Sequence, residues 1–360
     1  MQRHMISPLI IAAALCHPAT ALAHSGGEAR ETVEAVCSAC HSIRTVESTS
    51  GYSRDDWQSL TATMIDLSGA PEMQAEILDY LAEHYPPNDN RAATPVDGPL
   101  IISFEEWQVP TLGQRSRDPV EAGDGSIWWV GQWLDILGRL DPETGAMEEF
   151  DLPAGAGPHS VTIGPDGDAW YTGNRNATIG RFNPASGEIT EYPMPDEAAR
   201  DPHTAEFDAN GIMWFSLQGS NMIGRLDPQS GEVRLVDSPR ANSRPYGVKI
   251  AEDGIVWVAC NGANCLLRVD PETMDVEEIT LPDAGTTVRR LDIDADGMIW
   301  WVNSRLGRLG RYDPQSGEIR EWESPSGSSS HPYAIAVFDG AIWYNESGVR
   351  PDMLVRFDPQ

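Results

Sequence analysis

The sequence has little positive charge and almost no long apolar segments. Its 360 residues include 25 lysine and arginine residues against 55 aspartate and glutamate residues, and Lys249 is the only lysine, so the net charge is −30. Proteins that bind polyanions rely on cationic patches. The composition therefore excludes DNA, RNA and anionic lipid as expected partners. Beyond the N-terminus no apolar run reaches the roughly 20 residues that cross a bilayer, so no membrane span is expected after that segment.

The N-terminal segment has the pattern of an export signal. Arg3 and His4 precede an apolar stretch over 5–16, and Ala-Leu-Ala at 21–23 fits a small-residue cleavage site. Residues 1–23 are therefore interpreted as a cleaved signal, with an uncleaved anchor or a lipoprotein as alternatives. Cleavage predicts a soluble protein that is periplasmic or otherwise exported, where disulfides and covalent haem both form.

Cysteine is scarce, with five residues in the chain. Cys16 would leave with the signal, which leaves the pairs Cys37 with Cys40 and Cys260 with Cys265. In an exported chain the second pair predicts a local disulfide, and two buried free thiols are the alternative.

The first pair belongs to the motif Cys37-x-x-Cys40-His41, which is the attachment pattern of c-type haem. The two thiols form thioethers with the haem, and the adjacent imidazole is the proximal ligand of the iron. A zinc site would need further ligands at similar spacing. A thioredoxin-type redox pair would need a βαβ context. The motif therefore predicts one covalent haem c on Cys37 and Cys40, with His41 bound to the iron.

Helical patterns surround the motif. Apolar residues recur every three or four positions before it and again over 57–67, where Ser53 and Asp56 resemble a capping box; Pro71 opens a last helix. Three short helices over residues 24–90 therefore predict a small all-α domain.

The distal iron ligand is expected to be a methionine. The spacing places Met64 in mid-helix on the inward face, and Met73, at a helix start, is the runner-up. An ordinary core methionine is the alternative for Met64. Methionine ligation leaves the iron no open position, which predicts an electron carrier. The segment resembles the small cytochrome c modules of bacterial periplasmic oxidoreductases, and this resemblance implies electron exchange with a periplasmic redox partner protein.

A repeat follows a turn-rich linker at 91–99. Its arginines recur every 42 to 45 residues, and a tryptophan strand precedes each arginine strand in each unit. Repeats of 40 to 45 residues with short strands are typical of propeller blades. We expect the arginines and tryptophans to be structural. The arginines are Arg139, Arg181, Arg225, Arg268, Arg311 and Arg356, and the tryptophans are Trp128, Trp170, Trp214, Trp257, Trp300 and Trp343.

The predicted fold class is multidomain: the all-α cytochrome c domain, then an all-β six-bladed propeller over 100–360. The last repeat ends before its outer strand, and 102–110 has the matching pattern. We expect this N-terminal strand to pair with the last blade and close the ring, because closure removes open sheet edges.

Polar residues are expected at the mouth of the propeller channel, where each innermost strand starts. A second ring, which includes Glu346, should follow each tryptophan. Together these groups predict a site for an anionic or polar small molecule, or for a metal through two histidines. The alternative is a watery channel lined by polar groups. The first ring comprises Arg117, His159, His203, Tyr246, Arg289 and Tyr333.

The repeats, for example "PHSVTIGPDGDAWYTGN", resemble the streptogramin (virginiamycin B) lyase family over about 98–360. The resemblance implies elimination that opens a macrocyclic ester, with Mg²⁺, a histidine pair and a glutamate. His159 and His203 occupy Pro-His positions, and Glu346 occupies the glutamate position. The chain departs from the family in having six repeats instead of seven, and Tyr333 in the blade of Glu346 where the lyase has a histidine.

Two functions follow from these patterns. The first is haem-based electron transfer, with the propeller as a module that binds a substrate or partner. The alternative is a catalytic propeller, either a Mg²⁺-dependent lyase or a dehydrogenase that passes electrons to the haem. The fusion itself favours redox chemistry, because a lyase has no electrons to pass on.

Overall fold

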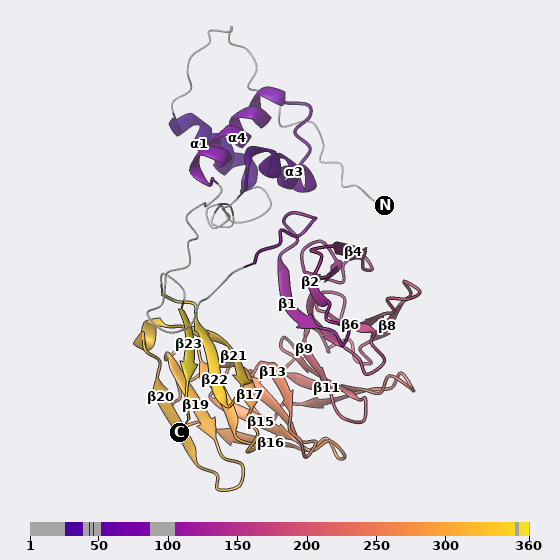
Figure 1. Cartoon of the computed structure of the whole chain (residues 1–360), viewed down its shortest axis with the longest axis vertical. Coiled ribbons are helices and arrows are strands. Elements are labelled where there is room, and N and C mark those ends of the chain that lie inside the picture. The colour runs from indigo at the N-terminus through magenta and orange to yellow at the C-terminus, as the bar shows by residue number, and fades with distance from the viewer. Residues whose placement is uncertain are drawn as a thin grey trace. The chain divides into compact units, whose positions relative to one another are not determined.

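A computed structural model describes residues 26–38, 43, 46, 52–86, 105–349 and 353–359. The chain divides into two compact units between Pro95 and Val96, inside the linker expected from the sequence. Each unit is described separately below (Figure 1). Among the described residues, no helix is both long enough and apolar enough to cross a membrane.

The first unit contains three principal helices, α1 (Gly26–Cys37), α3 (Arg54–Met64) and α4 (Pro71–His84). The predicted capping box is present: Ser53 Oγ accepts the N–H of Asp56, and the Asp56 carboxylate accepts the N–H of Ser53. Pro71 starts α4, where a missing N–H costs nothing. Helix α4 packs against both α1 and α3. Their shared core comprises Val33, Trp57, Leu60, Ile77, Leu78 and Leu81.

The second unit consists of six antiparallel sheets, each built from strands consecutive in the chain. The first holds β1 (Ser116–Glu121), β2 (Ile127–Gly131), β3 (Ile136–Leu140) and β4 (Met147–Asp151). The second holds β5 (Pro158–Ile163), β6 (Ala169–Gly173), β7 (Thr178–Phe182) and β8 (Ile189–Pro193). The third holds β9 (Pro202–Phe207), β10 (Met213–Leu217), β11 (Met222–Leu226) and β12 (Val233–Asp237).

The remaining sheets continue the pattern. The fourth holds β13 (Pro245–Ile250), β14 (Val256–Cys260), β15 (Cys265–Val269) and β16 (Val276–Thr280). The fifth holds β17 (Val288–Ile293), β18 (Ile299–Asn303), β19 (Arg308–Tyr312) and β20 (Ile319–Glu323). The sixth, after the short helix η1 (Gly327–Ser329), holds β21 (Pro332–Phe338), β22 (Ala341–Glu346) and β23 (Met353–Phe357). These propeller-like units confirm the β-repeat expected from the sequence.

The repeated tryptophan and arginine pair across the second and third strands of every sheet, as Trp170 and Arg181 do in the second. There the guanidinium carbon lies 5.5 Å from the centre of the indole ring, and the guanidinium also binds Asp166 and Asp168 at 2.6 Å. The indole itself is buried against the neighbouring sheet. A buried, stacked and ion-paired position explains the repeat by packing, so the arginine and tryptophan have the structural role expected of them.

The glycine before this arginine makes room for the second aromatic residue. Gly180 lies opposite Tyr171, and a Cβ on Gly180 would come within 2.0 Å of the Tyr171 ring. Gly138, Gly224 and Gly310 face Trp129, Phe215 and Trp301 in the same way. The fourth sheet has Val258 opposite Leu267 instead. The aromatic residue and the glycine are therefore one packing unit within the sheet.

Cys260 and Cys265 form a disulfide at the end of the β14–β15 hairpin. Both residues are fully buried within the core between the third and fourth sheets. The bridge therefore fixes the connection between two central strands.

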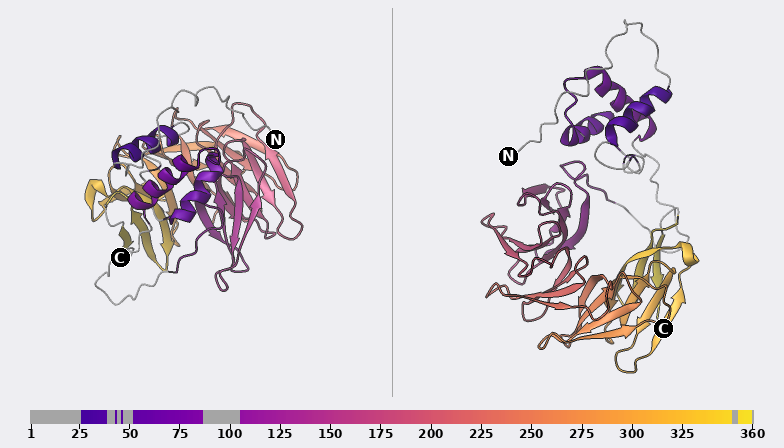
Figure 2. Two further views of the ribbon diagram at one scale, coloured as in Figure 1. Left: turned by 90° about the horizontal axis from the view of Figure 1, so that it is seen from above. Right: turned by 180° about the vertical axis from the view of Figure 1, so that it is seen from behind.

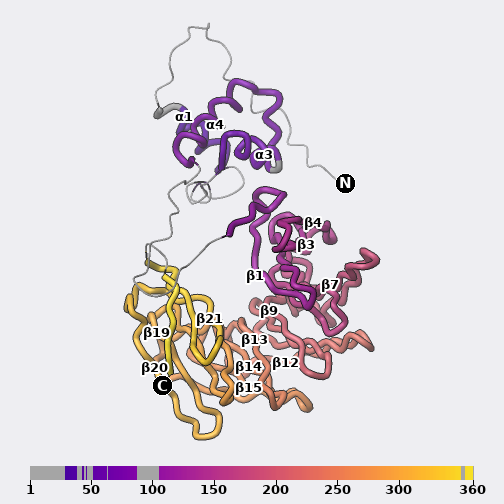
Figure 3. The backbone as a smooth tube through the Cα atoms, viewed as in Figure 1, coloured from indigo at the N-terminus to yellow at the C-terminus, as the bar shows by residue number. Residues whose placement is uncertain are grey.

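The sheets follow one another side by side in an arc (Figures 1 and 3), and the view from behind shows the same succession (Figure 2). Successive innermost strands contact each other in series from β1 to β21. The arc stays open between the first sheet and the β21–β23 sheet, which has three strands. In the part of the chain that is described, the ring is therefore not closed.

The predicted closing strand needs correction. Residues 102–104 lie outside the described residues, and 105–109 have no strand structure. The chain that follows is held to the first sheet instead: the Thr111 hydroxyl and the Gln114 amide both donate to the Glu149 carboxylate at 2.6 Å. Gln114 Oε1 also accepts the indole N–H of Trp129 at 2.7 Å. These polar anchors attach the segment to the face of the first sheet.

Candidate functional site

The candidate site is built by irregularities in the innermost strands. Each of these strands shifts register near its N-terminal end, as β5 does between Pro158 and Val161. A bulge of this kind re-aims side chains and bends the strand. In each of the six sheets, the residue that was expected at the channel mouth is the second residue of the innermost strand and lies at this register shift. These residues, called the axial ring below, are Arg117, His159, His203, Tyr246, Arg289 and Tyr333.

Four members of the axial ring form a continuous series of aromatic contacts. The ring centres of His159 and His203 lie 3.5 Å apart, and those of His203 and Tyr246 lie 3.9 Å apart. The Tyr246 and Tyr333 hydroxyls are hydrogen-bonded at 2.8 Å. Both histidines and Tyr246 are buried, whereas Tyr333 is half-buried. The structure thus brings together side chains that are separated by up to 174 residues (159 to 333) in the sequence.

Guanidinium groups surround this aromatic series. Arg289 lies 5.2 Å from the centre of the Tyr333 ring, and Arg290 lies 5.5 Å from that of Tyr246. Arg290 Nη2 also donates to Asp118 Oδ2 at 2.9 Å, which links β17 to β1. Arg117 Nη1 donates to the neutral Gln132 amide oxygen at 2.9 Å. Among the described residues, only Arg290 in this group has a carboxylate partner within 4 Å.

The histidines are neutral at physiological pH. Burial lowers the pKa of His159 to about 3, and the charge of Arg117 adds to this effect, while Asp118 opposes it. Burial also lowers the pKa of His203 well below its usual range, and His159 and Arg290 lower it further. Burial raises the pKa of Tyr246 to about 12. The axial ring therefore presents two uncharged imidazoles and the uncharged Tyr246 phenol beside guanidinium groups.

Sequence reasoning missed three residues of this site. Arg290 and Asp118 are the third residues of their strands, directly after Arg289 and Arg117 in the register shift. Arg115 lies just before β1, 5.2 Å from the ring centre of Trp133. The two consecutive arginines at 289–290 were the sequence signal that could have pointed to Arg290. The bulge that turns two consecutive residues inward could not be seen in the pattern.

Glu346 is held apart from the histidines. It is 1% exposed, and its Oε1 accepts the Ser324 hydroxyl and the Ser326 N–H, while its Oε2 accepts the Ser326 hydroxyl at 2.5 Å. Burial raises the pKa of Glu346, but hydrogen bonds from Ser324 and Ser326 outweigh this and lower it overall. Glu346 therefore anchors the loop before η1.

The residues expected to hold Mg²⁺ do not fit that ion. No group of three or more histidine, cysteine or carboxylate side chains in the described ranges is arranged to hold a metal. Mg²⁺ takes oxygen ligands in octahedral geometry. Asp118, whose carboxylate lies 3.8 Å from His159, is bound to Arg290, and both Glu346 oxygens are already hydrogen-bonded.

Cys37, at the end of α1, is half-buried, and burial raises the pKa of its thiol. Cys40 and His41 lie outside the described residues. Met64 is the last residue of α3 and is 53% exposed. The expected mid-helix, inward-facing position is therefore wrong, because the helix ends there and Ile65 is extended. Its role as an iron ligand stays a prediction.

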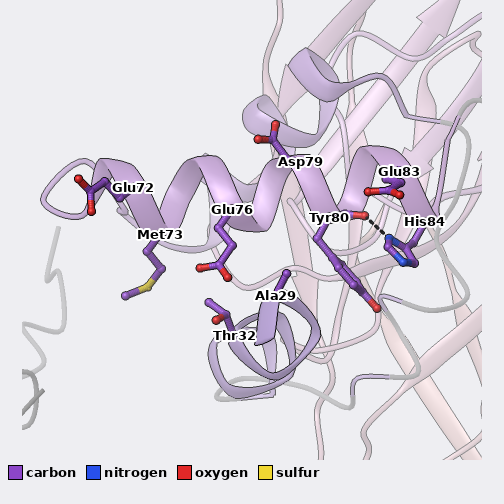
Figure 4. A pocket seen from close by; sticks show the side chains of 9 residues that line it. All are labelled: Ala29, Thr32, Glu72, Met73, Glu76, Asp79, Tyr80, Glu83 and His84. Carbon is purple, nitrogen blue, oxygen red and sulfur yellow. Dashed lines mark hydrogen bonds between the residues drawn. The ribbon is translucent and has the colours of Figure 1, made fainter. Parts of the chain in front are cut away.

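Met73 lies on a different surface of the first unit. It lines a groove between α1 and α4 whose α4 side is acidic (Figure 4). At the far end, the His84 ring stacks on Tyr80 at 4.0 Å, and His84 Nδ1 donates to the Tyr80 carbonyl at 3.0 Å. The groove also contains Glu72, Glu76, Asp79 and Glu83. The carboxylates along the α4 side of this groove make a polar surface, which suits a haem edge less than the apolar core does.

The comparisons with known proteins concern the second unit. The family model described as the virginiamycin B lyase family matches residues 101–350. The chain is similar in structure to virginiamycin B lyase from Staphylococcus aureus, with a TM-score of 0.61 and 25% identity over 68% of this chain and 84% of that one. It is also similar to a streptogramin B lyase, with a TM-score of 0.64 and 25% identity over 71% of this chain and 87% of that one.

A third similar structure is a catalytically inactive histidine-to-alanine variant of the Staphylococcus aureus lyase with quinupristin. Its TM-score is 0.62, at 24% identity over 67% of this chain and 80% of that one. No curated protein sequence matches the chain.

Proposed function

Because the chain belongs to the virginiamycin B lyase family, we propose that its propeller-like unit is a ligand-binding module attached to an exported haem c unit that transfers electrons. The observation that carries the proposal is the Cys37-x-x-Cys40-His41 motif at the end of α1, in a separate helical unit. The signal-like N-terminus and the Cys260–Cys265 disulfide support export, the compartment in which haem c and disulfides both form.

The described part of the first unit fits a haem. The indole N–H of Trp57 is buried without a hydrogen-bond partner among the described residues, a costly arrangement that a haem propionate would relieve. The thioether of Met64 is exposed at the end of the same helix, free to take up a ligand. Cys37 is half-buried, with its thiol not bonded to another described cysteine.

In this proposal Cys37 and Cys40 would hold the haem covalently, and His41 and Met64 would bind its iron. The haem supplies reversible one-electron chemistry at the iron. The buried apolar residues around Trp57 would limit the access of water to a haem bound there. A redox partner protein in the same compartment would exchange the electron.

Lyase chemistry in the propeller is not part of the proposal, although family membership raises it. Elimination of the family type calls for a glutamate next to the histidine pair. Glu346 instead binds Ser324 and Ser326, and no described contact joins it to His159 or His203. Incubation with quinupristin and Mg²⁺ tests this exclusion directly. Ring opening that is abolished by Glu346→Gln would restore the lyase function.

Absorption spectroscopy of the exported full-length protein tests the haem proposal. We expect a reducible low-spin c-type spectrum and a methionine-to-iron charge-transfer band in the oxidised form. Met64→Ala should remove that band and keep the covalent haem, whereas Met73→Ala should leave both unchanged. A band lost only in Met73→Ala would move the ligand to α4, and a protein without covalent haem would refute electron transfer.

A further inference from the structure

We propose that the axial ring binds an organic anion, a carboxylate carried on a flat or apolar body, and that it does so without Mg²⁺. The inference rests on the ligand-binding role proposed above for the propeller, but it does not depend on the haem.

The local charge of the site is opposite to that of the chain. Arg117 and Arg289 belong to the ring, and Arg115 and Arg290 act electrostatically on its members. Asp118 is the carboxylate whose charge acts on His159. Asp118 is already paired with Arg290. Arg115, Arg117 and Arg289 therefore have no carboxylate within 4 Å in the part of the chain that the structure describes, although the protein has a net charge of −30. Uncompensated cations kept close together in so acidic a chain are typical of a site for an anion.

A buried donor or acceptor in the ring also lacks a partner. His159 is 4% exposed, and its Nδ1 makes no hydrogen bond in the described part of the protein. Asp118 Oδ2 lies 3.8 Å away, beyond hydrogen-bonding distance. Buried polar atoms are rarely left unpaired in proteins. A ligand oxygen beside His159 would accept from this nitrogen.

The shape of the donors favours a carboxylate. Arginine presents a planar fork of N–H groups that matches a carboxylate in a two-point contact. Arg117 has committed one nitrogen to Gln132, and the Arg289 guanidinium lies over Tyr333 rather than in an ion pair. Both side chains are half-buried, so they are partly desolvated and still reachable. Contacts of this kind to a charged group are stronger than those in open water.

The walls of the ring favour an apolar body on the ligand. Half-buried Tyr333 offers aromatic surface next to buried Tyr246, and Trp133 is 45% exposed beneath Arg115. Exposure of the apolar indole ring to water is unfavourable, so the stacking of a flat ligand on this ring would be favourable. Inorganic phosphate would satisfy the arginines but leave this surface in water.

The same arrangement disfavours a metal ion. Arg117 and Arg290 act on His159, so a divalent cation there would meet two permanent positive charges. His203 Nδ1 is hydrogen-bonded to the Thr204 hydroxyl at 3.1 Å. The ring therefore keeps the histidine positions of the lyase family in surroundings suited to an anion.

Calorimetric titration of the exported full-length protein tests the inference with benzoate as the probe. We expect saturable binding of benzoate, no binding of the neutral analogue benzamide, much weaker binding of inorganic phosphate, and no effect of Mg²⁺ or of a chelator. Arg117→Gln and Arg289→Gln should each weaken benzoate binding by about tenfold or more. Arg320→Gln, on the exposed outer strand β20, is the matched control and should bind as the unaltered protein does.

The alternatives give different results. Equal binding of benzoate and benzamide, absence of saturable benzoate binding, or binding that requires Mg²⁺ and survives both arginine substitutions would overturn the inference. Phosphate binding as tight as benzoate binding would contradict the apolar body. Arg117→Lys and Arg289→Lys should restore part of the affinity, which separates loss of charge from loss of fold. The haem spectrum, recorded on the same samples, reports on the proposed electron-transfer function independently of these titrations.

Discussion

At the scale of residues, the axial ring owes its chemistry to burial next to fixed charge. His159 and His203 are surrounded by aromatic rings and by Arg117 and Arg290, so protonation of either imidazole is opposed twice. Position in the repeat predicted that these histidines face the axis. Their neutrality could not be predicted, because it depends first on burial and because Arg290 reaches the ring through a bulge that leaves no mark in the spacing.

This burial predicts how stability depends on pH. His159 titrates at about 3 in the folded protein and near 6.5 when unfolded, so acidification below about 6.5 protonates the unfolded state first. The free energy of unfolding should therefore fall as the pH drops from 6.5 toward 3. The variant His159→Gln lacks this titration. Its free energy of unfolding, relative to that of the unaltered protein, should therefore be higher at pH 5 than at pH 8. Urea unfolding at both pH values measures it, and a constant difference would contradict the assignment.

At the scale of elements, the strands are specified by pairs of residues that the sequence repeats. The tryptophan and arginine positions predicted the strands and their order, because the two residues are direct cross-strand partners, as Trp170 and Arg181 are. The N-terminal strand was not predictable in the same way. The sequence pattern at 102–110 matches an outer strand, but Thr111 and Gln114 bind Glu149 of the first sheet, and side-chain anchoring of this kind has no periodicity to detect.

The pairing of glycine with an aromatic residue makes a prediction about these elements. Gly180→Ala would place a methyl group within 2.0 Å of the Tyr171 ring, so we expect a loss of about 1–3 kcal/mol in the free energy of unfolding. Gly123→Ala, where a Cβ meets nothing within 4 Å, is the control and should change little. Urea denaturation compares the two variants.

A second variant tests the cause of that loss. Tyr171→Val, which imitates the aliphatic pair of the fourth sheet, combined with Gly180→Ala should cost less than the sum of the two single changes. If the losses of the two single variants simply add up in the double variant, the glycine is needed for the backbone conformation and not for contact with the aromatic ring.

At the scale of the whole molecule, two compact units with different chemistry share one chain. The second belongs to a lyase family, yet its axial ring presents cations where the family places a metal, and its glutamate is committed to a neighbouring loop. The first has the attachment motif of a haem, an exposed methionine and an unpaired buried indole N–H. These features support the two proposals separately: a redox function for the first unit, and for the second unit the binding of an organic anion rather than ring opening.

The intact mass of the exported full-length protein tests the central claim most directly. The account predicts a polypeptide that has lost residues 1–23 and gained one covalently bound haem, and it predicts that Cys37→Ser together with Cys40→Ser abolishes this gain while the Cys260–Cys265 disulfide persists. A mature chain with the mass of the bare polypeptide, produced in cells that attach haem to a control cytochrome c, would contradict it.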